Sequence, residues 1–244
     1  LLSFGLLNGL LLLVSLTDIQ GVWLNQQARS AAELSDYVHQ GTYLLIYALG
    51  LAMAVTTYFF RGNLHFLQDN QKLKLLAYAW IVQNIILALS VAWRNYHYIA
   101  EYGLAYKRLG VLWFLILVVL GLYSLFAMIQ QRRSLYYLWV INAWFLYASL
   151  LGSSMVNWDV LITRYNLNQA QHAKIDTLFL LREVSDKNLP LLLNEHELLL
   201  ERSNSAPETV DKFLQLKIKA FERRTARQGW RGWNWADEVT RRAL

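Results

Sequence analysis

Long apolar runs alternate with short polar joints over the first two thirds of the chain. The runs cover about residues 1–19, 41–60, 74–93, 109–130 and 135–156. A bilayer core of about 30 Å requires about 20 apolar residues per helix. Within lipid each segment must satisfy its own backbone polar groups, which favours helices, whereas a β-barrel would show short alternating segments. We therefore predict an all-α fold, a polytopic transmembrane helical bundle with about five spanning helices.

From about residue 167 the pattern changes to that of a small soluble helical region, because apolar residues recur at helical spacing between polar ones. A first helix is predicted by the apolar spacing over 173–184, and Pro190 suits the start of a second helix that ends near Arg202. Ser205 and Glu208 form a capping-box pattern before a third helix that runs to about Gln228. Asn234 with Asp237 is expected to cap a last helix. We predict two parts, a transmembrane bundle with polar joints over 1–166 and a helical C-terminal tail over 167–244.

The composition supports a membrane protein and excludes several other classes. Hydrophobic residues make up 56% of the chain and charged residues 16%, against about 45–50% and about 25% in soluble domains. The net charge of +6 is spread along the chain, which favours anionic lipid headgroups over nucleic acid as the partner. Cysteine is absent, which removes disulfides, thiolate metal sites and cysteine nucleophiles. We expect no metal and no cofactor.

The polar residues within the runs are few. Gln83, Asn84 and Asn142 are amides that we expect to form hydrogen bonds between helices. No charged residue lies at the middle of a run, which argues against a transporter. Residue 1 is a leucine inside an apolar run, so we expect further helices upstream. Basic residues divide almost evenly between the two sides, and we place loops 61–73 and 130–134 in the cytoplasm and the tail outside it.

Three polar joints should lie on the same side of the membrane, and they hold the candidate site. The joints are residues 33–41, 93–108 and 157–166. The candidate site residues are Glu33, Asp36, His39, Arg94, Tyr98, Glu101, Tyr102, Arg108, Asn157, Asp159, Arg164 and Tyr165. We assign no catalytic residue among them.

The first joint combines acids with a histidine. If it is helical, Glu33, Asp36 and His39 share a face, and carboxylates can tune a histidine that titrates near neutrality. Such a group could bind a cation or transfer a proton. It could equally be an interfacial helix whose charged groups pair with arginines of the neighbouring joints, and we favour that interpretation.

The second joint carries Arg94, Tyr98, Glu101, Ala105 and Arg108 at helical spacing, which would line one face. Arginine presents a bidentate fork to phosphate, so this face could recognise an anionic headgroup. It could also be a polar network that fixes helix ends, which we favour. Gly103 permits a bend between the two runs.

The third joint supplies complementary charge. We expect Asp159 to pair with Arg94 or Arg108, and Arg164 to pair with Glu33 or Glu101. Such pairing would close a network across the three joints, although an active site would have the same composition.

The joints resemble those of a bacterial polytopic membrane family that is known only as a domain of unknown function. The matching residues are Glu33, Leu34, Val38, His39 and Gly41, then Tyr98, Glu101, Tyr102, Gly103, Leu104 and Arg108, and finally Asn157, Asp159, Ile162, Arg164, Tyr165 and Asn166. Ala105 stands where the family pattern usually has Thr. The resemblance covers nearly the whole chain and implies a bacterial inner-membrane protein, but no activity.

Two functions remain open on these grounds. The favoured one is a non-enzymatic inner-membrane component, acting as subunit, scaffold or sensor in an envelope assembly, with membrane lipids and other membrane or envelope proteins as partners. The tryptophans at 230, 233 and 235 would then pack the tail onto a partner or onto the membrane. The alternative is a membrane-embedded enzyme or binder that acts on a lipid or envelope precursor at the three joints.

Overall fold

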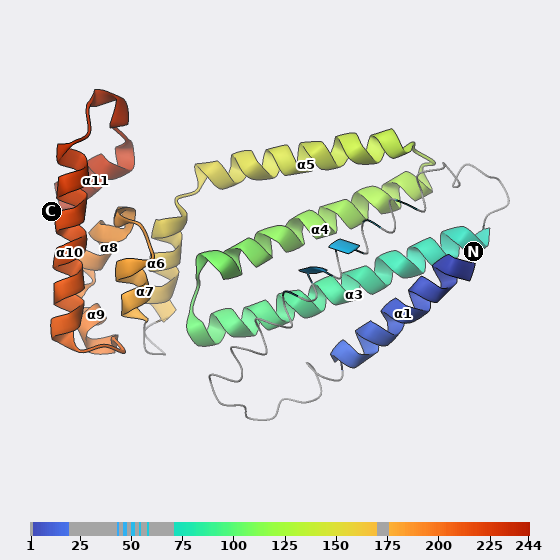
Figure 1. Cartoon of the computed structure of the whole chain (residues 1–244), viewed down its shortest axis with the longest axis horizontal. Helices are drawn as coiled ribbons and strands as arrows, with labels where there is room; N and C mark the ends of the chain where they lie inside the picture. Colours follow the sequence, from blue (N-terminus) through green and yellow to red (C-terminus); the bar gives the residue numbers. More distant parts are fainter. Residues whose placement is uncertain are drawn as a thin grey trace. The chain divides into compact units, whose positions relative to one another are not determined.

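The computed structural model describes residues 2–19, 71–169 and 176–244, together with a few helical positions between 43 and 58. Every element in these ranges is helical (Figure 1). The elements are α1 (Leu2–Ile19), α3 (Gln71–Tyr102), α4 (Tyr106–Gln130), α5 (Leu135–Met155), α6 (Trp158–Gln169), α7 (Thr177–Arg182), η3 (Asp186–Asn188), α8 (Leu189–Asn194), α9 (His196–Arg202), α10 (Pro207–Ala226), η4 (Trp230–Gly232) and α11 (Trp235–Ala243).

The predicted all-α class is confirmed for the described residues, whereas five spanning helices are not. Three described helices are long and apolar enough to cross a membrane: α3 from Lys74 to Tyr102, α4 and α5. The apolar part of α1, Phe4–Asp18, is shorter than a full span. The run at 41–60 lies largely outside the described residues.

The chain forms two compact units. The first comprises Leu1–Tyr98 and Lys107–Met155, and the second comprises Ile99–Tyr106 and Val156–Leu244. The second unit thus contains α6 and the turn between α3 and α4, which the sequence analysis assigned to the membrane domain. The functional division at residue 166 stays a prediction.

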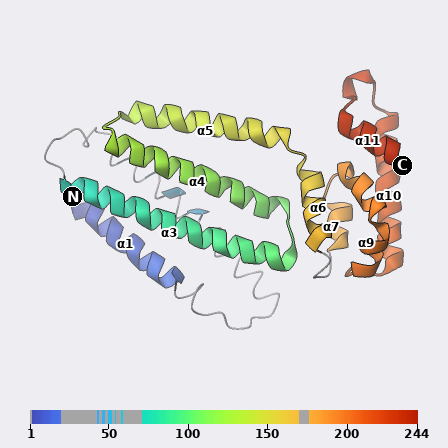
Figure 2. The ribbon, with the colours of Figure 1, turned by 180° about the vertical axis from the view of Figure 1, so that it is seen from behind.

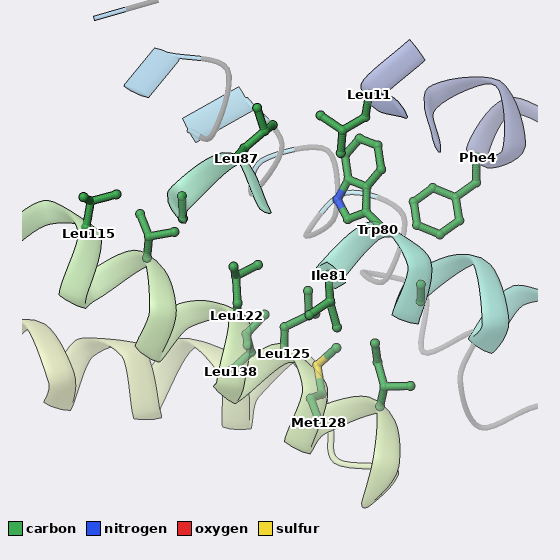
Figure 3. Close-up of a cluster of buried hydrophobic side chains, with 14 of the residues drawn as sticks. Phe4, Leu11, Trp80, Ile81, Leu87, Leu115, Leu122, Leu125, Met128 and Leu138 are labelled. Atoms are coloured by element: carbon green, nitrogen blue, oxygen red, sulfur yellow. The ribbon is translucent and has the colours of Figure 1, made fainter. Parts of the chain in front are cut away.

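In the first unit, α3 lies between α1 and α4, and α5 lies along α4 (Figures 1 and 2). Their contact is a cluster of buried apolar side chains that includes Phe4, Trp80, Leu122 and Leu138 (Figure 3). The rings of Phe4 and Trp80 are 5.7 Å apart, within the range of favourable aromatic pairs. Burial of these side chains joins α1 and α5 to α3 and α4.

The predicted interhelical amide is present at Asn142. Its Nδ2 donates to Ser124 Oγ of α4 at 2.8 Å and to its own helix at Leu138 O at 2.8 Å. Asn84 instead donates to Trp80 O within α3 at 2.7 Å. A hydrogen bond from a side-chain amide to a neighbouring helix stabilises a bundle in lipid by roughly 0.6–2 kcal/mol.

The second joint is broken by a sharp turn. The predicted face from Arg94 to Arg108 does not continue along one helix, because α3 ends at Tyr102 and α4 begins at Tyr106. Gly103 between them has φ +73°, a left-handed conformation that favours glycine. The bend expected at Gly103 is therefore confirmed, and the helical face ends there.

The second unit is built around α10. This helix buries Val210, Leu214 and Phe221 along one face, as expected for an amphipathic helix. α10 contacts α7, η3 and α9, while α11 contacts α8 and η3. α6 packs on η3 and α8, which makes α6 part of the same core.

One predicted helix cap is present and the other is wrong. Asn234 caps α11, because its Oδ1 accepts from Asp237 N at 2.9 Å. The predicted capping box of Ser205 and Glu208 does not form. α10 begins with Pro207 at its first position and has Ala206 as its N-cap, so Ser205 lies one residue too early to reach the helix N-terminus.

Gly103 gives the first testable prediction. A Cβ at this position would lie 2.5 Å from Asn166 Oδ1, and the left-handed backbone costs a side-chain residue about 1–2 kcal/mol. Gly103→Ala should therefore lower the thermal unfolding temperature in detergent. Gly229→Ala is the control, since a Cβ there meets nothing within 4 Å. An equal response of the two variants would contradict this account.

Candidate functional site

The predicted site residues divide into three groups. Glu33, Asp36 and His39 lie outside the described residues. The first unit holds Arg94, Tyr98 and Arg108. The second unit holds Glu101, Tyr102, Asn157, Asp159, Arg164 and Tyr165.

Arg94 is buried in the first unit and pairs with an acid of α1. Its guanidinium forms an ion pair with Asp18, and the two side chains are 7% and 8% exposed. Ser90 also donates to the Asp18 carboxylate. A buried charge pair needs such added hydrogen bonds to offset its desolvation. Sequence analysis missed Asp18, although it is the single acid at the end of the first apolar run.

Tyr98 and Arg108 meet at the ends of α3 and α4. The Arg108 guanidinium lies 4.0 Å from the centre of the Tyr98 ring, a favourable cation–π distance. Asn95 Nδ2 donates to the Arg108 carbonyl at 3.0 Å. These contacts hold the two helix ends of the first unit together.

The second and third joints meet at Asn166. Its Oδ1 accepts from Leu104 N at 2.6 Å and its Nδ2 donates to Leu104 O at 2.9 Å. Gln169 Nε2 donates to Ala100 O nearby. Both Leu104 and Asn166 are buried, so these hydrogen bonds of the Asn166 side chain satisfy backbone groups of the turn that water does not reach. The α3–α4 turn is thereby attached to α6.

Asp159 has hydrogen-bond donors as partners within the second unit. Its Oδ1 accepts from the Tyr106 hydroxyl, and its Oδ2 accepts from Ser185 Oγ at 2.7 Å. The ion pair expected for Asp159 with Arg94 or Arg108, which belong to the first unit, stays a prediction. Asp159 therefore connects the start of α4 to the segment between α7 and η3.

The other predicted residues of the second unit lie nearer the surface. Glu101, Arg164 and Tyr165 are exposed, and Tyr102 is half-buried. The ion pair expected between Arg164 and Glu101 is not found among the described residues. Asn157 Oδ1 accepts from Val160 N at 3.3 Å and so supports the first turn of α6.

An open cavity of about 610 Å³ lies in the second unit beside Asp159. The polar residues in its lining include Asp159, Ser185, Asp186, Lys217, Arg224 and Asp237. We call the cavity that these residues line the polar cavity. Among the described residues no three His, Cys, Asp or Glu side chains are grouped so that they could hold a metal ion.

Lys217 is the buried cation of the polar cavity. Its side chain is 8% exposed, and Nζ donates to Leu180 O at 2.9 Å and Val184 O at 2.8 Å. Burial lowers the pKa of Lys217 to about 8, while the charges of Asp186 and Asp159 oppose that shift. Lys217 thus holds the C-terminal end of α7 against α10.

Arg224 carries the main ion-pair network of the cavity. It forms a fork with Asp237, at 2.9 Å from Nη1 to Oδ2 and 2.6 Å from Nη2 to Oδ1. Its Nε donates to Asp186 Oδ2 at 3.0 Å. Hydrogen bonds from Arg224 and Asn234 lower the pKa of Asp237 despite its burial, and hydrogen bonds to the two acids raise the pKa of Arg224.

Sequence analysis missed Lys217 and Arg224 as site residues, although their spacing carried a signal. The buried residues Val210, Leu214, Lys217 and Phe221 occur at intervals of three and four, and Arg224 is the next position of the series. A basic residue on the apolar face of an amphipathic helix is expected to reach buried acceptors.

The fork between Arg224 and Asp237 gives a prediction about α11. Asp237→Asn should remove charge-assisted hydrogen bonds from a buried position and destabilise the attachment of α11 by about 2–3 kcal/mol. Faster hydrogen exchange of the α11 amides would report this loss. Arg241→Gln should have little effect, because Arg241, which pairs with Glu238 at 3.3 Å, is itself exposed. Unchanged exchange in Asp237→Asn would contradict a structural role for the fork.

Lys217 predicts a pH dependence of stability. Its pKa is about 8 in the folded protein and about 10.4 in an unfolded chain. Between these values the unfolded state binds more protons, so this lysine should make stability rise with pH, by about 3 kcal/mol at most. Thermal unfolding from pH 7 to 10 should show the rise, and Lys217→Met should lose it. Lys212→Met, an exposed position of the same helix, should keep it.

Comparison with known proteins identifies the family. No curated protein and no solved structure matches this chain. A family model described as a domain of unknown function, DUF4153, matches residues 1–195, which include the described apolar helices and the α3–α4 turn with α6. The chain therefore belongs to the DUF4153 family.

Proposed function

We propose that this chain is a non-enzymatic integral component of the bacterial inner membrane, serving as subunit, scaffold or sensor in an envelope assembly. Three helices of spanning length support its place in a membrane. The uncharacterised family is compatible with that role and assigns no activity. In this proposal the second unit is a folded platform on the extracytoplasmic side.

The observation that supports the non-enzymatic role is that each carboxylate of the polar cavity accepts hydrogen bonds from other residues of the chain. Asp159 accepts from two hydroxyls, Asp186 accepts from Arg224, and Asp237 accepts from Arg224 and Asn234. A general acid or base must reach a reacting group with its own proton or lone pair. Carboxylates that already accept hydrogen bonds from neighbouring residues favour a structural role over general acid or base catalysis.

A binder of an anionic lipid or envelope precursor is the second candidate, and Lys217 favours it. This cation is buried beside an open cavity, and its hydrogen-bond acceptors are two neutral carbonyls. A buried charge of this kind is stabilised by an anion.

Purification in gentle detergent from the native membrane separates the two functions. We expect a protein partner that co-elutes in fixed ratio with the wild-type chain and with Lys217→Met, because the proposed subunit role does not require a cation in the polar cavity. Mass spectrometry of the co-eluting proteins and lipids is the measurement. Lys212→Met, which changes an exposed lysine of α10, is the matched control.

A chain without a protein partner would contradict the proposed role. If such a chain carried a phosphate-bearing lipid that Lys217→Met released and Lys212→Met retained, the second candidate would replace it.

A further inference from the structure

The last helix of the chain is inverted, with polar residues buried and apolar residues exposed. Asp237 and Thr240 of α11 are 4% and 1% exposed, whereas Trp235 and Val239 are 65% and 42% exposed. Trp235, Val239 and Arg242 follow one another at intervals of four and three residues, so they share one helix face. A surface helix of a soluble domain would place these two sets the other way round, with the apolar residues toward the core.

The inversion is fixed by hydrogen bonds. The Arg224 fork holds the Asp237 carboxylate, and Asn234 caps the helix through Asp237 N. α11 contacts α8 and η3. With its polar side attached in this way, the helix must present Trp235 and Val239 outward.

The surroundings of this face combine tryptophan with arginine. Trp233, two residues before Trp235, is 61% exposed. Arg231 precedes Trp233 by two residues, and Arg242, which shares the face with Trp235, is 3.1 Å from Glu238 on its own helix. Tryptophan prefers the membrane–water interface, and arginine near it is attracted to anionic headgroups. We call Trp233, Trp235, Val239 and Arg242 the α11 face.

Connectivity brings the second unit within reach of a membrane. The chain passes between the two units after Tyr98, after Tyr106 and after Met155. The last two crossings adjoin the ends of helices long enough to span a bilayer, and α6 follows α5 after two residues. A surface of this unit therefore meets the headgroups at a high local concentration.

We propose that the α11 face docks onto the anionic headgroup surface of the membrane that the apolar helices span. The indoles would lie at the boundary between headgroups and acyl chains, and Arg242 with Arg231 would contact lipid phosphates. The inference rests on the proposed membrane location. It lies beyond the residues matched by the family model, which end at 195.

The absence of native cysteine permits a direct test with single spin labels. The full chain carrying Val239→Cys is labelled and placed in nanodiscs of phosphatidylcholine alone or with phosphatidylglycerol. We expect collisions of the label with a water-soluble nickel complex to fall several-fold, and collisions with oxygen to rise, in the anionic discs. Glu208→Cys, an exposed position on the first turn of α10, should stay accessible to nickel in both.

Two further variants assign the cause. Trp233→Ser with Trp235→Ser, studied with the label at Val239→Cys, should restore nickel access. Since both indoles are largely exposed, the thermal unfolding temperature in detergent should not change. Arg231→Gln with Arg242→Gln should remove the difference between the two lipids. A label accessible to nickel in both discs, or equally protected in both, would overturn the proposal.

A label at Val119→Cys separates this proposal from the membrane location on which it rests. Val119 lies on α4 and is 53% exposed, so it should be accessible to oxygen and protected from nickel in both discs. If Val119→Cys behaves in this way while Val239→Cys does not respond, the docking of α11 fails alone. If Val119→Cys is accessible to nickel, the spanning role of α4 fails as well.

Discussion

The amide of Asn166 is the contact on which the architecture of the second unit depends. It pairs with both the N–H and the carbonyl of Leu104, and it can do so only because Gly103 takes a left-handed conformation without a Cβ. This pairing recruits a turn between two apolar helices into a unit made otherwise of the last third of the chain. Asp159 adds a second link through Tyr106 and Ser185.

Charge is arranged differently in the two units. In the first, Asp18 and Arg94 form a buried pair supported by Ser90, as expected where water cannot compensate a lone charge. In the second, Arg224 holds two acids beside an open cavity, and Lys217 uses backbone carbonyls. These buried acids and bases fix helices to one another, and the outward surface of α11 carries the exposed Trp235 and Val239.

Much of the fold could be predicted from sequence because its causes are local. Apolar run length predicts α3, α4 and α5, Gly103 predicts a turn, and the spacing of Asn234 and Asp237 predicts a helix cap. The partners of Arg94 and Asp159 could not be predicted, since they depend on which helix ends meet in three dimensions. The capping box at Ser205 failed because Pro207 starts the helix one residue later. The site at Glu33, Asp36 and His39 stays a prediction.

The pairing of Asn166 with the α3–α4 turn also has a consequence for synthesis. The ribosome makes Leu104 well before Asn166, so the turn leaves the ribosome with its backbone groups hydrogen-bonded to water or to other groups. The turn can reach its final state only after α5 and α6 have been made. Translation therefore completes α3, α4 and α5 before the second unit can be completed, and residues 156–244 made alone would lack residues 99–106 of that unit, which include the buried Leu104.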